Sequence, residues 1–124
     1  MYHLWLEAPH TLVLQVIGAL TEKAVLDLME TTREYVSRSE EALVVLIDLS
    51  RAQAVPLHVR LHLVTLMRMP HVMALALWGG SKTVELMATV ALKAAGALDR
   101  ACFFATEAEA RVWLSEEIKA YSQD

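Results

Sequence analysis

The last third of the sequence constrains the fold more than any other part. An apolar run at 71–78 leads into Gly-Gly-Ser-Lys at 79–82, and a helix-patterned stretch follows. A second apolar run at 101–105 and a capped helix from 106 complete this part of the chain. This order is typical of right-handed α/β crossovers, because neighbouring parallel strands need a helix between them. The sequence therefore predicts a parallel sheet at its C-terminal end.

The N-terminal part extends this sheet. Residues 2–6 and 11–17 are β-type runs separated by a short polar interval with a proline, as in a hairpin. Residues 21–36 have apolar side chains at helical spacing, behind a threonine N-cap. Residues 43–47 are apolar without alternation, which is typical of a parallel strand covered on both faces. We expect residues 48–50 to leave the sheet at its carboxyl end.

A further helix is predicted at 57–69, behind a proline that suits a first helical position. The element order is then ββαβαβαβα in one domain, 1–124. We therefore predict an α/β fold with a mainly parallel sheet, an N-terminal antiparallel hairpin strand and helices packed on the sheet.

Composition excludes several classes of protein. Lysine and arginine are scattered and the formal net charge is -4, which argues against nucleic-acid binding. No uncharged apolar run approaches the roughly 20 residues of a transmembrane helix. The single cysteine, Cys102, leaves no internal disulfide, so we expect a cytoplasmic protein. Hydrophobic residues make up 56% of the chain, and this surplus indicates either an oligomer face or an apolar ligand site.

The first candidate site is the turn of Gly79, Gly80, Ser81 and Lys82. It lies where a strand ends and a helix begins, so helix amides and a lysine could bind a small anion there. The full phosphate-loop and dinucleotide-binding patterns are absent. A plain tight turn is the alternative interpretation, and the favoured one.

The second candidate site is the predicted helix at 57–69, whose apolar arc is wider than contact with one sheet requires. His58 and His62 lie four residues apart, a spacing that metal ligands also have. No zinc-protease glutamate accompanies them, so we predict no metal site. We predict instead a homodimer or protein-partner interface that includes Leu63, Met67 and Met69.

No catalytic residues are predicted. Asp48 and Ser50 lie close together at a strand end, but no nucleophile-elbow pattern surrounds either Ser50 or Ser81. Asp48 is expected to cap or hydrogen-bond its own loop. The sequence therefore predicts a protein that is not an enzyme and that needs no cofactor.

Three motifs resemble the SpoIIAA-like branch of the STAS superfamily, which includes anti-sigma factor antagonists. They are the strand ending in Asp-Leu-Ser at 48–50, the strand running into Gly-Gly-Ser-Lys, and Phe103-Phe104 followed by Glu-Ala-x-x-Trp-Leu at 109–114. The resemblance implies a regulatory or protein-interaction module. Antagonists of this superfamily carry a phosphorylated serine after the central strand, whereas this chain has Val-Pro-Leu-His at 55–58. We therefore expect no phosphoserine switch, and Ser50 lies too far upstream to be an equivalent.

The same branch is similar in fold to lipid-binding domains of the CRAL-TRIO type. This likeness gives a second hypothesis, a carrier or sensor of a small apolar or acidic, lipid-like ligand. The acidic group of the ligand would lie at residues 79–82, and its tail would lie among Met73, Leu75 and Leu77.

Overall fold

A computed structural model describes residues 1–7, 10–38, 42–53, 72–94, 96 and 99–123. Five strands and three helices occur in this part of the chain. In chain order they are β1 (Tyr2–Glu7), β2 (Thr11–Gly18), α1 (Glu22–Arg38), β3 (Leu43–Ala52), β4 (Val72–Trp78), α3 (Lys82–Ala94), β5 (Ala101–Phe104) and α4 (Glu107–Gln123). The predicted helix at 57–69 lies outside the described residues.

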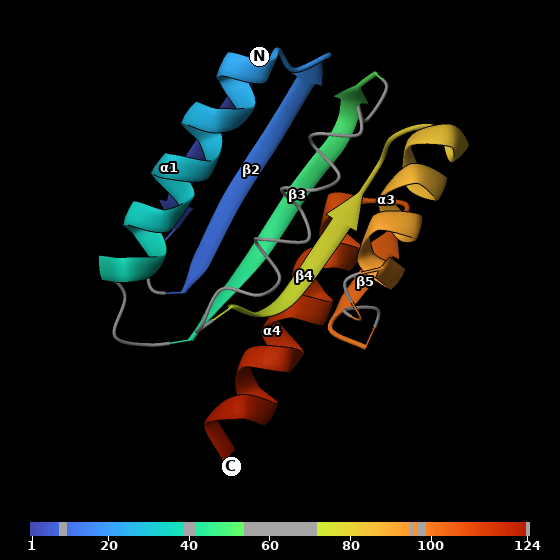
Figure 1. The fold of residues 1–124 in the computed structure, drawn as a ribbon. Coiled ribbons are helices and arrows are strands. Elements are labelled where there is room, and N and C mark those ends of the chain that lie inside the picture. The colour runs from blue at the N-terminus through green and yellow to red at the C-terminus, as the bar shows by residue number, and fades with distance from the viewer. Residues whose placement is uncertain (8–9, 39–41, 54–71, 95, 97–98, 124) are drawn as a thin grey trace.

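The strands form one sheet in the order β1-β2-β3-β4-β5 (Figure 1). β1 pairs antiparallel with β2, and each later pair is parallel. The predicted class, a mainly parallel sheet with an N-terminal antiparallel strand, is confirmed. β1 and β5 are the edges of this sheet.

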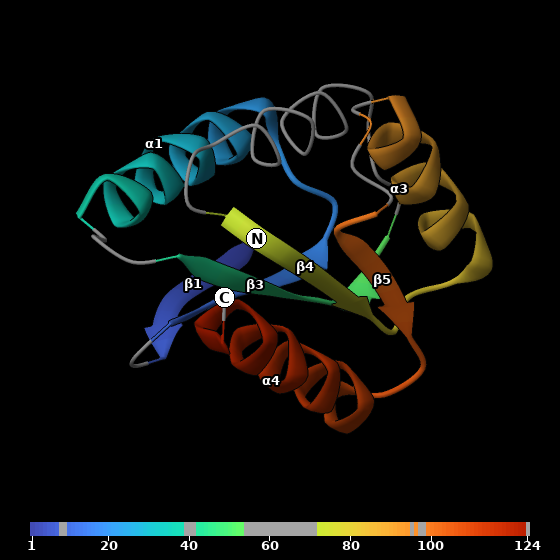
Figure 2. The same ribbon diagram turned by 90° about the horizontal axis from the view of Figure 1, so that it is seen from below.

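The sheet has helices on both faces. α1 and α3 lie over one face and α4 lies over the other (Figure 2). In β3, Leu43, Val45 and Ile47 pack toward α1 and α3, whereas Val44 and Leu46 pack toward α4. All of them are at most 1% exposed, so the unbroken apolar run does mark a strand covered on both sides.

Hydroxyl side chains begin the described helices, as the sequence predicts. The oxygens of Thr21, Ser81 and Thr106 accept hydrogen bonds from backbone N–H groups three residues further on, at 3.1, 3.2 and 3.3 Å. Such bonds satisfy donors that the first helical turn leaves without a partner. These capping residues mark where α1, α3 and α4 begin, after the carboxyl ends of β2, β4 and β5.

The prediction that residues 48–50 leave the sheet is wrong. β3 continues to Ala52, because Arg51 and Ala52 pair with Ile17 and Gly18 of β2. The register between the two strands shifts by one residue there, since Gln15 pairs with Asp48 whereas Ile17 pairs with Arg51. Asp48 therefore lies in a strand and not in a loop, next to β2 on one side and β4 on the other.

Candidate functional site

The Gly79-Gly80 turn packs directly against β3. Both glycines have positive φ, 74° and 80°, which L side chains rarely adopt. A β-carbon on Gly79 would lie 2.9 Å from both Cα and Cβ of Ser50, and one on Gly80 would lie 3.2 Å from the Leu49 carbonyl oxygen. Backbone conformation and close packing therefore account for both glycines without a ligand.

Ser81 and Lys82 occupy the beginning of α3. The Ser81 hydroxyl accepts a hydrogen bond from the Val84 N–H at 3.2 Å, and its carbonyl accepts one from Glu85 at 3.0 Å. Lys82 is the first helical residue and is exposed. The residues expected to bind an anion are thus contiguous at a helix N-terminus, and anion binding there stays a prediction.

Asp48 is the buried carboxylate at this edge of the sheet, with 8% of its surface exposed. Its Oδ1 accepts hydrogen bonds from the Ser50 N–H at 2.8 Å and from the Ser50 hydroxyl at 2.6 Å. Its Oδ2 accepts one from the Gln15 side-chain amide at 3.1 Å. Both oxygens therefore bind groups of the chain itself. The expected hydrogen bonding of Asp48 to its own segment is confirmed, and its bond to β2 was not predicted.

Asp48 belongs to a row of side chains that crosses four strands on the α4 face. Gln15, Asp48, Trp78 and Phe104 occupy successive register positions of β2, β3, β4 and β5. Phe104 contacts Trp113 of α4, with ring centroids 5.7 Å apart. The Trp78 Nε1 is buried and has no hydrogen-bond partner among the described residues. The row is thus polar toward β2 and aromatic toward β5.

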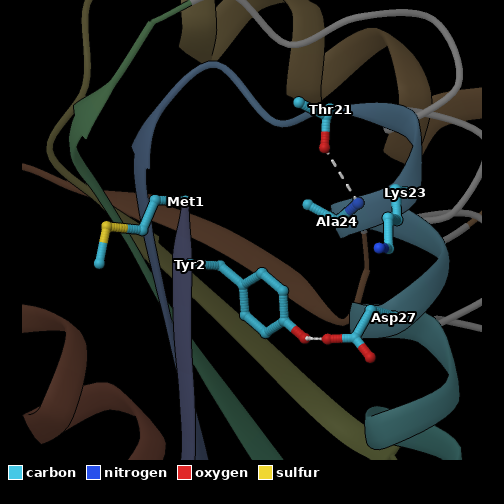
Figure 3. Close-up of a pocket in the computed structure, with 6 residues that line it drawn as sticks. All are labelled: Met1, Tyr2, Thr21, Lys23, Ala24 and Asp27. Carbon is cyan, nitrogen blue, oxygen red and sulfur yellow. Dashed lines mark hydrogen bonds between the residues drawn. The ribbon is translucent and has the colours of Figure 1, made fainter.

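A shallow groove of about 590 Å³ lies between the start of β1 and the first turns of α1. Met1, Tyr2, Lys23 and Asp27 line it, with Thr21 and Ala24 at its upper end (Figure 3). The Tyr2 hydroxyl donates a 2.5 Å hydrogen bond to Asp27. Burial raises the pKa of the Tyr2 phenol, and the bond to Asp27 adds to this effect. The groove was not predicted, because it joins residues from two elements whose packing is not visible in the sequence.

An ion pair ties the end of β1 to α4. Arg111 donates to both carboxylate oxygens of Glu7, at 2.7 and 3.1 Å, and also to Glu107 at 3.3 Å. The Trp5 indole N–H donates to Glu7 at 3.2 Å. These bonds hold the pKa of the Glu7 carboxyl below its ordinary value, with the Arg111 bond as the largest cause.

The Glu7–Arg111 pair predicts a small pH dependence of stability. The unfolded chain restores the ordinary Glu7 pKa of 4.5, so the stabilisation is complete above that pH and disappears as pH falls through the lower folded value. We expect wild type to exceed Glu7→Gln by at most about 1 kcal/mol in free energy of unfolding at pH 7, because such exposed pairs contribute little. Urea unfolding at pH 7 and pH 3 measures this difference. An equal difference at both values would contradict the prediction.

The residues predicted for an interface, His58, His62, Leu63, Met67 and Met69, lie outside the described residues, and their role stays a prediction. The residues predicted for a ligand tail do not share one face of the sheet. Leu75 and Leu77 pack toward α1 and α3, whereas Met73 packs in the α4 cluster. A register shift between Leu43 and Val44 of β3 places Met73 there, so a single pocket lined by all three is a wrong prediction.

Metal-binding clusters and membrane-spanning helices are absent from the described part of the chain. Within it, no three His, Cys, Asp or Glu side chains gather closely enough to hold a metal ion. None of the helices in those ranges has the length and apolar character needed to span a bilayer.

Comparisons with known proteins identify the fold. No protein-family model and no curated protein matches the sequence. An uncharacterised DUF3478-family protein from Shewanella loihica PV-4, with a SpoIIAA-like fold, is similar over 92% of both chains, with a TM-score of 0.67 and 18% identity. The anti-sigma factor antagonist SpoIIAA in its unphosphorylated form is similar over 94% of this chain and 97% of its own, with a TM-score of 0.64 and 17% identity. The chain therefore has a SpoIIAA-like fold, as its motifs predict.

Proposed function

We propose that this protein is a cytoplasmic, non-enzymatic STAS-like regulatory module that forms a homodimer and binds a protein partner. The proposal rests on a contrast between a buried polar group and exposed apolar side chains. The buried carboxylate at the carboxyl edge, Asp48, binds groups of its own chain, whereas large apolar side chains are exposed elsewhere. Leu86 and Val90, one turn apart on α3, are 65% and 53% exposed. Exposed apolar groups that adjoin one another are typical of interaction surfaces.

The fold likeness supports the regulatory part of the proposal. SpoIIAA, which is similar over 94% of this chain, is an anti-sigma factor antagonist. A free thiol at Cys102 suits a reducing compartment such as the cytoplasm.

We also propose that the module works without a phosphoserine switch. The Val-Pro-Leu-His sequence at 55–58 has no hydroxyl group to phosphorylate. The Ser50 hydroxyl, which is nearby in the sequence, donates a hydrogen bond to Asp48 at 2.6 Å. A phosphate on Ser50 would place about two negative charges beside that buried carboxylate and remove the hydrogen bond. Ser50 is thus poorly suited to be the switch residue.

Native mass spectrometry of gently purified protein, compared with the denatured mass, tests this proposal. We expect twice the 13.8 kDa chain mass with nothing else bound. A mass excess that disappears on denaturation would contradict the proposal and favour the carrier hypothesis. A monomer at all concentrations would overturn the homodimer.

A further inference from the structure

We propose that β1 is the homodimer interface, where the β1 strands of two copies pair antiparallel about a two-fold axis at Trp5. The two sheets would then form one continuous sheet across the dimer. This inference rests on the self-association in the proposed function and names its surface. It differs from the interface predicted at 57–69, which would remain available to a protein partner.

The backbone of β1 has an open hydrogen-bonding edge. The Ile17 N–H donates a hydrogen bond to the Met1 carbonyl oxygen, with an N to O distance of 2.8 Å, and the Met1 amino group donates one to the Ile17 carbonyl oxygen at 3.2 Å. Antiparallel pairs alternate, so every second residue after Met1 bonds to β2 and the residues between them point their N–H and C=O groups outward. The outward residues are Tyr2, Leu4 and Leu6. Among the described strands, β1 has β2 as its sole neighbour, and this edge faces away from the sheet.

β1 also lacks the features by which edge strands usually prevent pairing. Such strands are short, kinked by bulges, or marked by lysine and proline. Tyr2–Glu7 contains neither residue type, and its pairing with β2 has no register shift. Its one carboxylate, Glu7, is bound by Arg111 of the same chain. By contrast, the opposite edge strand, β5, has only four residues.

Exposed apolar side chains accompany this open backbone. Trp5 is 39% exposed and Leu6 is 45% exposed, and they lie on opposite faces of β1. A second strand at this edge would cover both side chains as well as the outward backbone groups. The apolar residues and the open edge thus lie in the same place, which favours a β-strand as the occupant.

One register makes the edge complementary to itself. Outward residues must pair with outward residues, so Leu4 can lie opposite Leu6 of the second copy. Trp5 then lies opposite its own equivalent, and His3 lies opposite Glu7 of the second copy. Aromatic pairs across strands are favourable, and an imidazole N–H faces a carboxylate acceptor. This self-complementarity favours a second copy over an unrelated strand.

Cysteine cross-linking tests the register. In a Cys102→Ala background, Trp5→Cys would place two thiols in a non-hydrogen-bonded pair with Cα atoms about 4.5 Å apart, within reach of a disulfide. We expect mild oxidation to convert Trp5→Cys into a covalent dimer. Leu26→Cys is the matched control: Leu26 is 57% exposed on α1 and should stay monomeric on a non-reducing gel. Cross-linking through Leu4→Cys in place of Trp5→Cys would overturn the proposed register.

A charge variant tests the interface without new covalent bonds. Trp5→Lys would place two ammonium groups opposite each other at the two-fold axis. We therefore expect the dissociation constant of the dimer to rise by at least about tenfold. Leu26→Lys adds the same charge away from β1 and should leave the dissociation constant of the dimer unchanged. Sedimentation measures both, and circular dichroism checks that each variant is folded.

Failures of the two proposals are distinguishable. Wild-type protein that is monomeric at every concentration would overturn the homodimer and this inference together. A dimer that survives Trp5→Lys and does not cross-link through Trp5→Cys would overturn the β1 interface alone. Loss of that dimer in Leu63→Asp would then assign it to the predicted helix at 57–69.

Discussion

Gly79→Ala is expected to lower the free energy of unfolding by roughly 2–5 kcal/mol. A positive φ costs an L residue about 1–2 kcal/mol, and forcing atoms into a packed site costs about 1–3 kcal/mol more. The φ of Gly79 is 74°, and its added β-carbon would lie 2.9 Å from Ser50 Cα and 3.0 Å from Ser50 N. Backbone atoms cannot rotate away as a flexible side chain could. The turn and β3 would have to separate to admit the methyl group.

Gly96→Ala is the matched control for this effect. Gly96 has a similar φ of 68°, but no atom of the described residues lies within 4 Å of the position that its β-carbon would take. We therefore expect a cost of only about 1–2 kcal/mol, from backbone conformation alone. Urea unfolding of both variants separates the two contributions. Equal losses would show that the approach of Gly79 to Ser50 contributes nothing.

Local signals in the sequence predict much of this fold. Apolar runs indicate β3 and β4, and the hydroxyl residues Thr21, Ser81 and Thr106 mark where helices begin. These signals work because a cap or a buried strand involves residues that are near one another in the chain. The order of elements then limits which strands can be parallel neighbours.

The parts that could not be predicted depend on distant residues. Polar residues after Ile47 look like a loop, and only pairing with β2 keeps Arg51 and Ala52 in the strand. Gln15 and Asp48 are 33 positions apart, and Glu7 and Arg111 are 104 positions apart. No spacing rule links such pairs, since their meeting depends on register and helix placement. The sequence therefore predicts the turn at 79–82 but does not reveal the row of side chains that crosses β2, β3, β4 and β5 beside it.

Asp48→Ala is expected to lower the free energy of unfolding by about 2–3 kcal/mol. The substitution removes the acceptor for the Ser50 N–H and hydroxyl and for the Gln15 amide. Hydrogen bonds to a charged group contribute about 1.5–3 kcal/mol, and a buried donor left without a partner adds a penalty. Ser50 is exposed, so water replaces part of what it loses, which keeps the total below the sum of three bonds. The half-buried Gln15 amide has less access to water.

Two variants distinguish this structural role from a catalytic one. Asp48→Asn keeps an acceptor oxygen for Ser50. We therefore expect its free energy of unfolding to lie only about 1 kcal/mol below that of wild type. A double-mutant cycle with Gln15→Ala should give a coupling of about 0.5–3 kcal/mol, because the two side chains share a hydrogen bond. A carboxylate kept for chemistry would show the opposite pattern, since replacing an active-site charge commonly leaves stability unchanged or raises it. Unchanged or higher stability in Asp48→Ala would therefore contradict the structural role and make Asp48 a candidate functional group again.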